Sequence, residues 1–125
     1  MQFLQSSPET VHHLLIECNH SQKIWHSLFE FITETSGVNI IPSKEEIILG
    51  MYNEDSDLSD FYNCILVIVK QYIYASRCLN KLPCLKVLIE KIKLERKLEY
   101  LLAIQNDKLH LWSRKWILLE SINLE

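Results

Sequence analysis

Residues 61–79, FYNCILVIVKQYIYASRCL, form the most apolar stretch of the chain, and they decide the fold. Three polar or charged residues, Lys70, Gln71 and Arg77, interrupt this stretch. It therefore falls short of the roughly 20 apolar residues that a membrane-spanning helix needs. We predict instead a long helix over about 58–80, buried on most sides within a folded domain, and no membrane partner.

The composition of the whole chain also favours helices. Its 125 residues are 48% hydrophobic and include only two glycines and three prolines. Scarce Gly and Pro favour helix over sheet, and a chain of this length fits one compact core. We predict an all-α fold, with a single domain over 1–125. The expected architecture is a small irregular bundle of about five helices, two of them long and in the C-terminal half.

Local start and stop signals divide residues 1–36 into two helices. Ser7, Pro8 and Glu9 are typical of a helix start, and we expect this first helix to end near Cys18. Asn19 or Ser21 is expected to cap the next helix, and Gly37 to end it. That second helix is amphipathic, with an apolar stripe made of Ile24, Trp25, Leu28, Phe29 and Ile32.

Residues 43–60 contain a short helix and then a loop. Ser43 and Glu46 have the spacing of a capping box, in which each side chain bonds to the backbone N–H of the other residue. This predicts a short helix over 43–52. The acidic run over 53–60 is expected to be a loop.

The last helical region begins at Pro83 and is expected to break near residues 106–107 before it continues to about 121. Residues 58–122 are thus predicted to form a long basic helical hairpin. Two apolar stripes lie on nearly opposite faces of this last region. One stripe consists of Leu85, Leu88, Ile89 and Ile92, and the other of Val87, Leu94, Leu98, Leu101 and Leu102. Two different surfaces must cover this helix, and we expect one of them to lie outside this chain.

The net charge of −3 hides an uneven distribution. Residues 1–64 contain two Lys/Arg and ten Asp/Glu, whereas residues 65–125 contain eleven Lys/Arg and six Asp/Glu. The halves therefore carry about −8 and +5. This asymmetry predicts a basic surface that binds a polyanion or an acidic partner; the alternative is that the two halves match each other within the molecule.

The four cysteines, Cys18, Cys64, Cys78 and Cys84, are unevenly spaced among apolar neighbours. This spacing is unlike that of a secreted disulfide framework, and polar residues interrupt any apolar leader near the start of the sequence. We expect reduced and mostly buried thiols in an intracellular protein of the nucleus or cytoplasm.

His13 and Cys18 are five positions apart, a spacing that lets an imidazole and a thiolate reach one metal ion. Two more ligands would be needed, and Met1 and Leu4 stand where a Cys-x-x-Cys pair would normally lie. We therefore expect no cofactor, with zinc as the alternative. In the favoured interpretation His13 and Cys18 are remnant ligands that pack or form hydrogen bonds.

Several short motifs resemble, in their order, the C-terminal region of reverse transcriptases from non-LTR (LINE-type) retrotransposons. That region opens with a zinc knuckle, of which His13 and Cys18 are the matching half. Residues 47–50 (IILG) are similar to its aliphatic-Leu-Phe/Leu-Gly step. Residues 65–83 are similar to its LxxAKxYIYxxRCxxxxP segment, and residues 94–116 to its closing helix. The matching residues are Lys70, Tyr72, Ile73, Tyr74, Arg77, Cys78, Pro83, Glu99, Tyr100, Asn106, Lys108, Lys115 and Trp116.

The resemblance implies a nucleic-acid-binding segment, with RNA or DNA and the remainder of a reverse transcriptase as its partners. We expect backbone contacts from eight cations and stacking from Tyr72, Tyr74 or Trp112. The eight cations are Lys70, Arg77, Lys81, Lys86, Lys93, Lys97, Arg114 and Lys115. For Lys86, Lys93 and Lys97, an ordinary solvated face with ion pairs to Glu90 is the competing interpretation.

No catalytic motif accompanies this resemblance. Residues 52–55 (YNED) are only a superficial echo of the paired aspartates of a polymerase, and the sequence has no phosphate-binding glycine loop. We therefore expect no enzymatic activity and no small-molecule substrate. The alternatives are a helical protein-interaction module, or a decayed transposon-derived reading frame without present activity.

Overall fold

The computed structural model describes residues 10, 13–39 and 41–120. Over these residues the chain is helical and contains no strand, which confirms the all-α fold class. None of the described helices is long and apolar enough to cross a membrane. The elements are η1 (His13–Glu17), α1 (Asn19–Ser36), α2 (Lys44–Leu49), α3 (Ser56–Cys78), α4 (Leu85–Gln105), α5 (Leu109–Lys115) and η2 (Ile117–Leu119).

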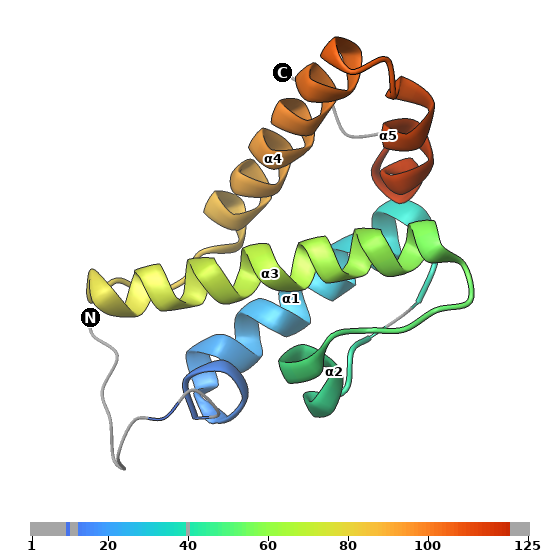
Figure 1. Cartoon of the computed structure of the whole chain (residues 1–125). Helices are drawn as coiled ribbons and strands as arrows, with labels where there is room; N and C mark the ends of the chain where they lie inside the picture. The colour runs from blue at the N-terminus through green and yellow to red at the C-terminus, as the bar shows by residue number, and fades with distance from the viewer. Residues whose placement is uncertain (1–9, 11–12, 40, 121–125) are drawn as a thin grey trace.

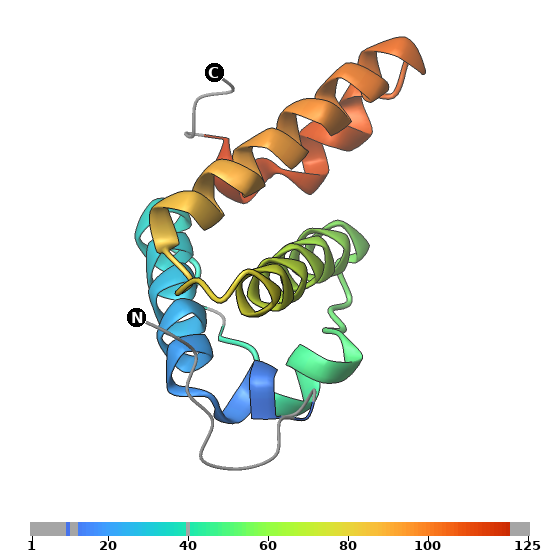
Figure 2. The ribbon, with the colours of Figure 1, turned by 90° about the vertical axis from the view of Figure 1, so that its left-hand side faces the viewer.

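The long helix α3 lies at the centre of the molecule, and the other elements are arranged around it (Figure 1). Figure 2 shows α3 almost end-on, with α1 on one side, α2 and the π-helical turn η1 below, and α4 with α5 above. Helices α4 and α5 contact each other and also α3. The two long helices expected within 58–122 are α3 and α4, which contact each other, and α5 contacts both of them.

The buried face of α3 supplies most of the core. Its six side chains that are no more than 1% exposed are Phe61, Tyr62, Ile65, Leu66, Val69 and Ile73. Trp116, which follows α5, is also 1% exposed and lies edge-on to the Phe61 ring at 5.6 Å between centroids. Because a buried Trp removes a large apolar area from water, this contact holds the C-terminal elements against α3.

The helix boundaries follow the predicted signals in part. Gly37 ends α1 in the left-handed conformation, with φ 77°, and the capping box of Ser43 and Glu46 starts α2. However, α2 ends at Leu49, because Gly50 adopts a φ of 102°, so the prediction that it extends to residue 52 was wrong.

The acidic run over 53–60 is only partly a loop. The Asp55 carboxylate accepts hydrogen bonds from the backbone N–H groups of Asp57 and Leu58, so α3 begins at Ser56. Aspartate is among the preferred N-cap residues because it satisfies otherwise unpaired N–H groups. The break predicted near residues 106–107 is confirmed: α4 ends at Gln105, and Asp107 has a φ of 57°.

Candidate nucleic-acid interface

The remnant knuckle residues lie where η1 joins α1. Most of the first predicted helix, over 7–18, lies outside the described residues. Cys18 is buried at the start of α1, and its backbone N–H donates to the carbonyl of His13 at 2.7 Å. The Nδ1 atom of His13 is 3.8 Å from Oε1 of Glu17. Among the described residues, no group of three or more His, Cys, Asp or Glu side chains is placed to hold a metal ion.

Side chains of α1 satisfy the carbonyl groups of the η1 turn. The Ser21 hydroxyl donates to the carbonyl of Leu14, the Gln22 side chain donates to that of Ile16 at 3.1 Å, and the Trp25 indole donates to that of Leu15 at 2.9 Å. The first turns of α1 thus hold η1 by direct hydrogen bonds. The prediction that Asn19 or Ser21 caps α1 was wrong, since α1 begins at Asn19 after Cys18, whose side chain forms no capping bond.

The eight predicted cations lie on three helices and on the turn between two of them. Lys70 and Arg77 are half-buried on α3, and Lys81 is exposed in the turn that follows it. Lys86 and Lys97 are exposed on α4, where Lys93 is half-buried. Arg114 and Lys115 lie at the end of α5. The eight residues are therefore distributed over α3, the turn after it, α4 and α5, and they do not form one continuous row on a single helix.

Lys115, Arg114 and Lys93 form ion pairs with other described residues. Lys115 Nζ lies 2.9 Å from Oε1 of Glu99, and both side chains are about a quarter exposed. Arg114 Nε is 3.5 Å from a carboxylate oxygen of Asp57, and Lys93 Nζ is 3.9 Å from Glu90. The last two pairs involve more exposed groups, and such pairs contribute little to stability.

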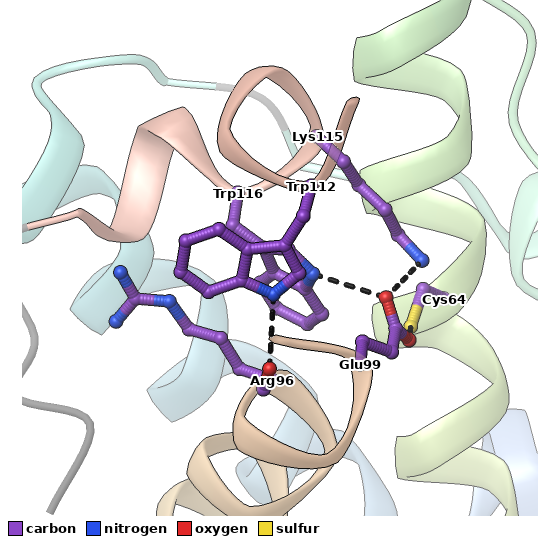
Figure 3. Close-up of polar contacts among 6 residues, drawn as sticks. All are labelled: Cys64, Arg96, Glu99, Trp112, Lys115 and Trp116. Atoms are coloured by element: carbon purple, nitrogen blue, oxygen red, sulfur yellow. Dashed lines mark hydrogen bonds and ion pairs between the residues drawn. The ribbon is translucent and has the colours of Figure 1, made fainter. Parts of the chain in front are cut away.

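Glu99 is the centre of a polar cluster where α3, α4 and α5 meet (Figure 3). Its Oε1 atom accepts hydrogen bonds from Lys115 at 2.9 Å and from the Trp116 indole at 3.1 Å. The thiol of Cys64, on α3, donates to its Oε2 atom at 3.7 Å. The cluster therefore links all three helices, and it gives Lys115 a structural role.

Burial and hydrogen bonding shift the pKa values in this cluster in opposite directions. Burial disfavours charge on Lys115 and Glu99, but their hydrogen bond, their mutual attraction and the other hydrogen bonds of the cluster together outweigh it, so the pKa of Lys115 is raised and that of Glu99 is lowered. A hydrogen bond with Glu99, together with burial, raises the pKa of Glu95. Burial raises the pKa of Cys64 to about 11, so this thiol is a poor nucleophile at neutral pH.

The cysteines differ more in exposure than the sequence suggested. All four are free thiols, but Cys78 and Cys84 are exposed, so the prediction that most would be buried was wrong. Cys84 is the residue before α4, where hydrogen bonds from the backbone N–H groups of Val87 and Lys86 lower its pKa. The exposed N-terminal end of α4 therefore carries a thiol that ionises more readily than an ordinary cysteine.

Two of the three predicted stacking residues have structural roles. The Tyr72 hydroxyl accepts a hydrogen bond from the Cys84 N–H at 2.8 Å and donates to the Cys84 carbonyl at 3.3 Å. The Trp112 indole donates to the carbonyl of Arg96 at 3.0 Å and lies against the Arg96 guanidinium (Figure 3). Only Tyr74 is well exposed, at 64%.

A row of side chains runs along one face of α3 toward its C-terminal end. Lys70, Tyr74 and Arg77 follow one another at i, i+4 and i+7, a spacing that places them on the same face. The exposed Lys81 and Lys86 follow in the turn and at the start of α4. Lys70, Tyr74 and Arg77, which we call the α3 row, combine two cations with an exposed aromatic ring.

The two apolar stripes predicted on α4 have different environments. Leu88 and Ile92, at 0% and 4% exposed, pack into the core. The second stripe is on the surface, and a further cation that the sequence analysis did not single out, Lys91, lies beside it. In the sequence, only the helical period of this segment could have indicated that Lys91 lies beside the exposed leucines.

Comparisons of the chain with family models, with curated proteins and with solved structures give no match.

Proposed function

We propose that this chain is a non-catalytic nucleic-acid-binding segment, of the kind that its resemblance to the C-terminal region of LINE-type reverse transcriptases implies. The observation that carries the proposal is Tyr74, which is 64% exposed on α3 between Lys70 and Arg77. An exposed ring beside cations suits RNA or single-stranded DNA, because bases stack on the ring while lysine and arginine contact phosphates.

The α3 row supports this proposal better than the other predicted cations do. Lys81 and Lys86, in the turn after α3 and at the start of α4, are also exposed. Lys115 contributes less, since Glu99 already neutralises its charge in a half-buried pair. We therefore assign the backbone contacts mainly to Lys70, Lys81 and Lys86.

The rest of the proposal follows from the same resemblance. The partners are RNA or DNA, with the remainder of a reverse transcriptase as a protein partner, and the location is the nucleus or cytoplasm. The segment needs no cofactor and acts on no small-molecule substrate.

The test is binding of the purified chain to a fluorescein-labelled RNA hairpin with a single-stranded loop and to a DNA duplex of matched length, over a salt series. Phosphate contacts make the logarithm of the binding constant fall linearly with the logarithm of salt concentration, by about 0.7–0.9 per contact. The variant K70Q/K81Q/K86Q should therefore flatten the slope by about two to three. Tyr74→Ala should weaken loop binding by about 1–3 kcal/mol with little change in slope.

The matched control is K23Q/K44Q/K108Q, which removes three exposed lysines outside the α3 row. It should bind with the slope of the unmodified chain. An equal loss of binding in the control would mean that binding depends on the net charge of the chain and not on the positions of these lysines. Absence of binding at low salt would refute the proposal for this chain.

A further inference from the structure

The outward face of α4 carries an uncovered aliphatic stripe. Its members are each between 45% and 57% exposed, although the same helix buries Leu88 and Ile92 in the core. The stripe consists of Val87, Leu94, Leu98, Leu101 and Leu102. In Figure 2, α4 runs along the edge of the molecule, with α3 and α5 on one side of it. Scattered exposed aliphatic residues are ordinary, but a contiguous row of this kind marks an interaction surface.

The spacing of the stripe matches a helical partner. Val87, Leu94, Leu98 and Leu101 recur at intervals of seven, four and three residues, the pattern of a seam between two packed helices. At 1.5 Å per residue the stripe extends over about 21 Å. A partner helix of about 15 residues would cover it along its full length.

The charges beside the stripe select the partner. Lys91 and Lys97, both exposed, lie next to the leucines, and Lys91 Nζ also lies 5.7 Å from the centre of the Tyr72 ring. On this face Glu90 pairs with Lys93 at 3.9 Å. A second copy of this chain fits poorly, because the outward side of α4 carries Lys86, Lys91, Lys93 and Lys97 against Glu90, so two copies would bring two basic faces together. Carboxylates on the partner would instead complement these lysines.

We propose that the outward face of α4 binds an amphipathic helix of another protein, whose aliphatic stripe is flanked by glutamates or aspartates. The mode of recognition is helix against helix, with the leucines providing the buried area and Lys91 and Lys97 fixing the orientation. This surface is separate from the α3 row, so the proposal goes beyond nucleic-acid binding and stands without it.

The probe is a fluorescein-labelled 18-residue peptide with leucines at heptad a and d positions and glutamates on both flanks. Two comparison peptides carry lysines in place of the glutamates, or the same residues in scrambled order. The variant L94Q/L98Q/L101Q should weaken binding of the glutamate peptide about tenfold or more. Its matched control, L49Q/L79Q/I117Q, removes three exposed aliphatic residues outside α4 and should bind as the unmodified chain does.

Circular dichroism of both variants checks that the fold is kept. We expect the unmodified chain and the control variant to bind the glutamate peptide and neither comparison peptide. The α4 variant should not bind the glutamate peptide. Equal binding of the lysine or scrambled peptide, or no binding up to solubility, would overturn the proposal. So would a dimer in sedimentation that dissociates in the α4 variant, or retention of the chain on anionic vesicles that the α4 variant abolishes. Neither result depends on the RNA assay, so the two proposals can fail separately.

Discussion

Lys115 and Glu99 form a 2.9 Å ion pair that joins the end of α5 to the middle of α4. Because Glu99 also accepts hydrogen bonds from Trp116 and Cys64, this contact connects the C-terminal elements to the central helix α3. A cation expected from the sequence to contact a polyanion thus holds the fold together.

Replacing Glu99 with Gln is expected to destabilise the chain by about 2 kcal/mol, because Lys115 then keeps a half-buried charge without its counter-ion. Urea unfolding followed by circular dichroism measures the change. Glu90→Gln is the control, since Glu90 is 61% exposed and its pair with Lys93 contributes little. Equal effects in the two variants would contradict a structural role for the Lys115 pair.

The stability should fall as the pH rises above about 9. Burial raises the pKa of Cys64 from 9.0 to about 11, so the folded chain keeps a proton that the unfolded chain releases. A group with a raised pKa in the folded state stabilises the fold below its unfolded pKa and loses that contribution above it. Lys115 and Tyr62 act in the same direction, since their pKa values are also raised.

Cys64→Ala should therefore lose less stability between pH 9 and 11 than the unmodified chain does. Urea midpoints at several pH values give the comparison. Cys78→Ala, which removes an exposed thiol, serves as the control and should follow the unmodified profile. An unchanged profile in Cys64→Ala would rule out this thiol as a source of the pH dependence.

Two buried tyrosines on α3 should respond oppositely to the same substitution. The hydroxyl of Tyr62 is buried and has no hydrogen-bond partner within the described part of the chain, whereas that of Tyr72 bonds to both backbone groups of Cys84. Tyr62→Phe should be neutral or stabilise the chain by up to about 1 kcal/mol. Tyr72→Phe should destabilise it by about 1–3 kcal/mol, because the Cys84 groups lose their partner.

The measurement is the free energy of unfolding of each variant. A destabilised Tyr62→Phe would indicate that this hydroxyl has a partner in solution. An unaffected Tyr72→Phe would mean that the turn before α4 does not depend on this bond.

Ser21→Ala should lower the unfolding free energy by about 1–3 kcal/mol, because the Leu14 carbonyl loses the buried hydroxyl that donates to it. Ser27→Ala, on the same helix, forms the control and should have a smaller effect on the unfolding free energy.

Thermal unfolding of the unmodified chain with zinc and with a chelator tests whether a metal stabilises the η1 turn. We expect equal midpoints, since side chains of α1 already hold the η1 turn. A higher midpoint with zinc would show that a metal stabilises this end of the molecule.

Local signals in the sequence predicted much of the fold. The helical class, the left-handed Gly37, the capping box at Ser43 and the break near residue 107 each depend on a few adjacent residues. Backbone preferences and capping act over such distances, so the sequence displays them directly. The start of α3 was predicted at about residue 58 instead of Ser56, because the acidic run over 53–60 was interpreted as a loop although Asp55 caps the helix.

The role of the candidate site residues depended on contacts between distant positions. Lys115 lies 16 residues from Glu99, and Cys64 lies 35 residues from it. Nothing local distinguishes a lysine that pairs across helices from one that faces solvent. The exposed leucines of α4 were predictable, because their face is set by the helical period alone.

Gly50→Ala should cost more stability than Gly37→Ala, although both glycines have positive φ. A Cβ at Gly37, with φ 77°, would meet nothing within 4 Å. Gly37→Ala should therefore lower the unfolding free energy by about 1 kcal/mol, because alanine disfavours the left-handed backbone. A Cβ at Gly50, with φ 102°, would lie 3.1 Å from Oδ1 of Asn63. That oxygen accepts from the Met51 N–H at 2.7 Å, and the Asn63 amide donates to the Met51 carbonyl at 2.9 Å.

The added methyl therefore has to displace the side chain that holds the α2–α3 connection to α3, and we expect a cost of about 2–3 kcal/mol. A double-mutant cycle with Asn63→Ala separates the two causes. If the contact with Asn63 contributes, Gly50→Ala costs less in the Asn63→Ala background, with a coupling of about 0.5–1 kcal/mol. Equal costs in both backgrounds would assign the whole effect to the backbone of Gly50, and urea unfolding of the four chains decides between them.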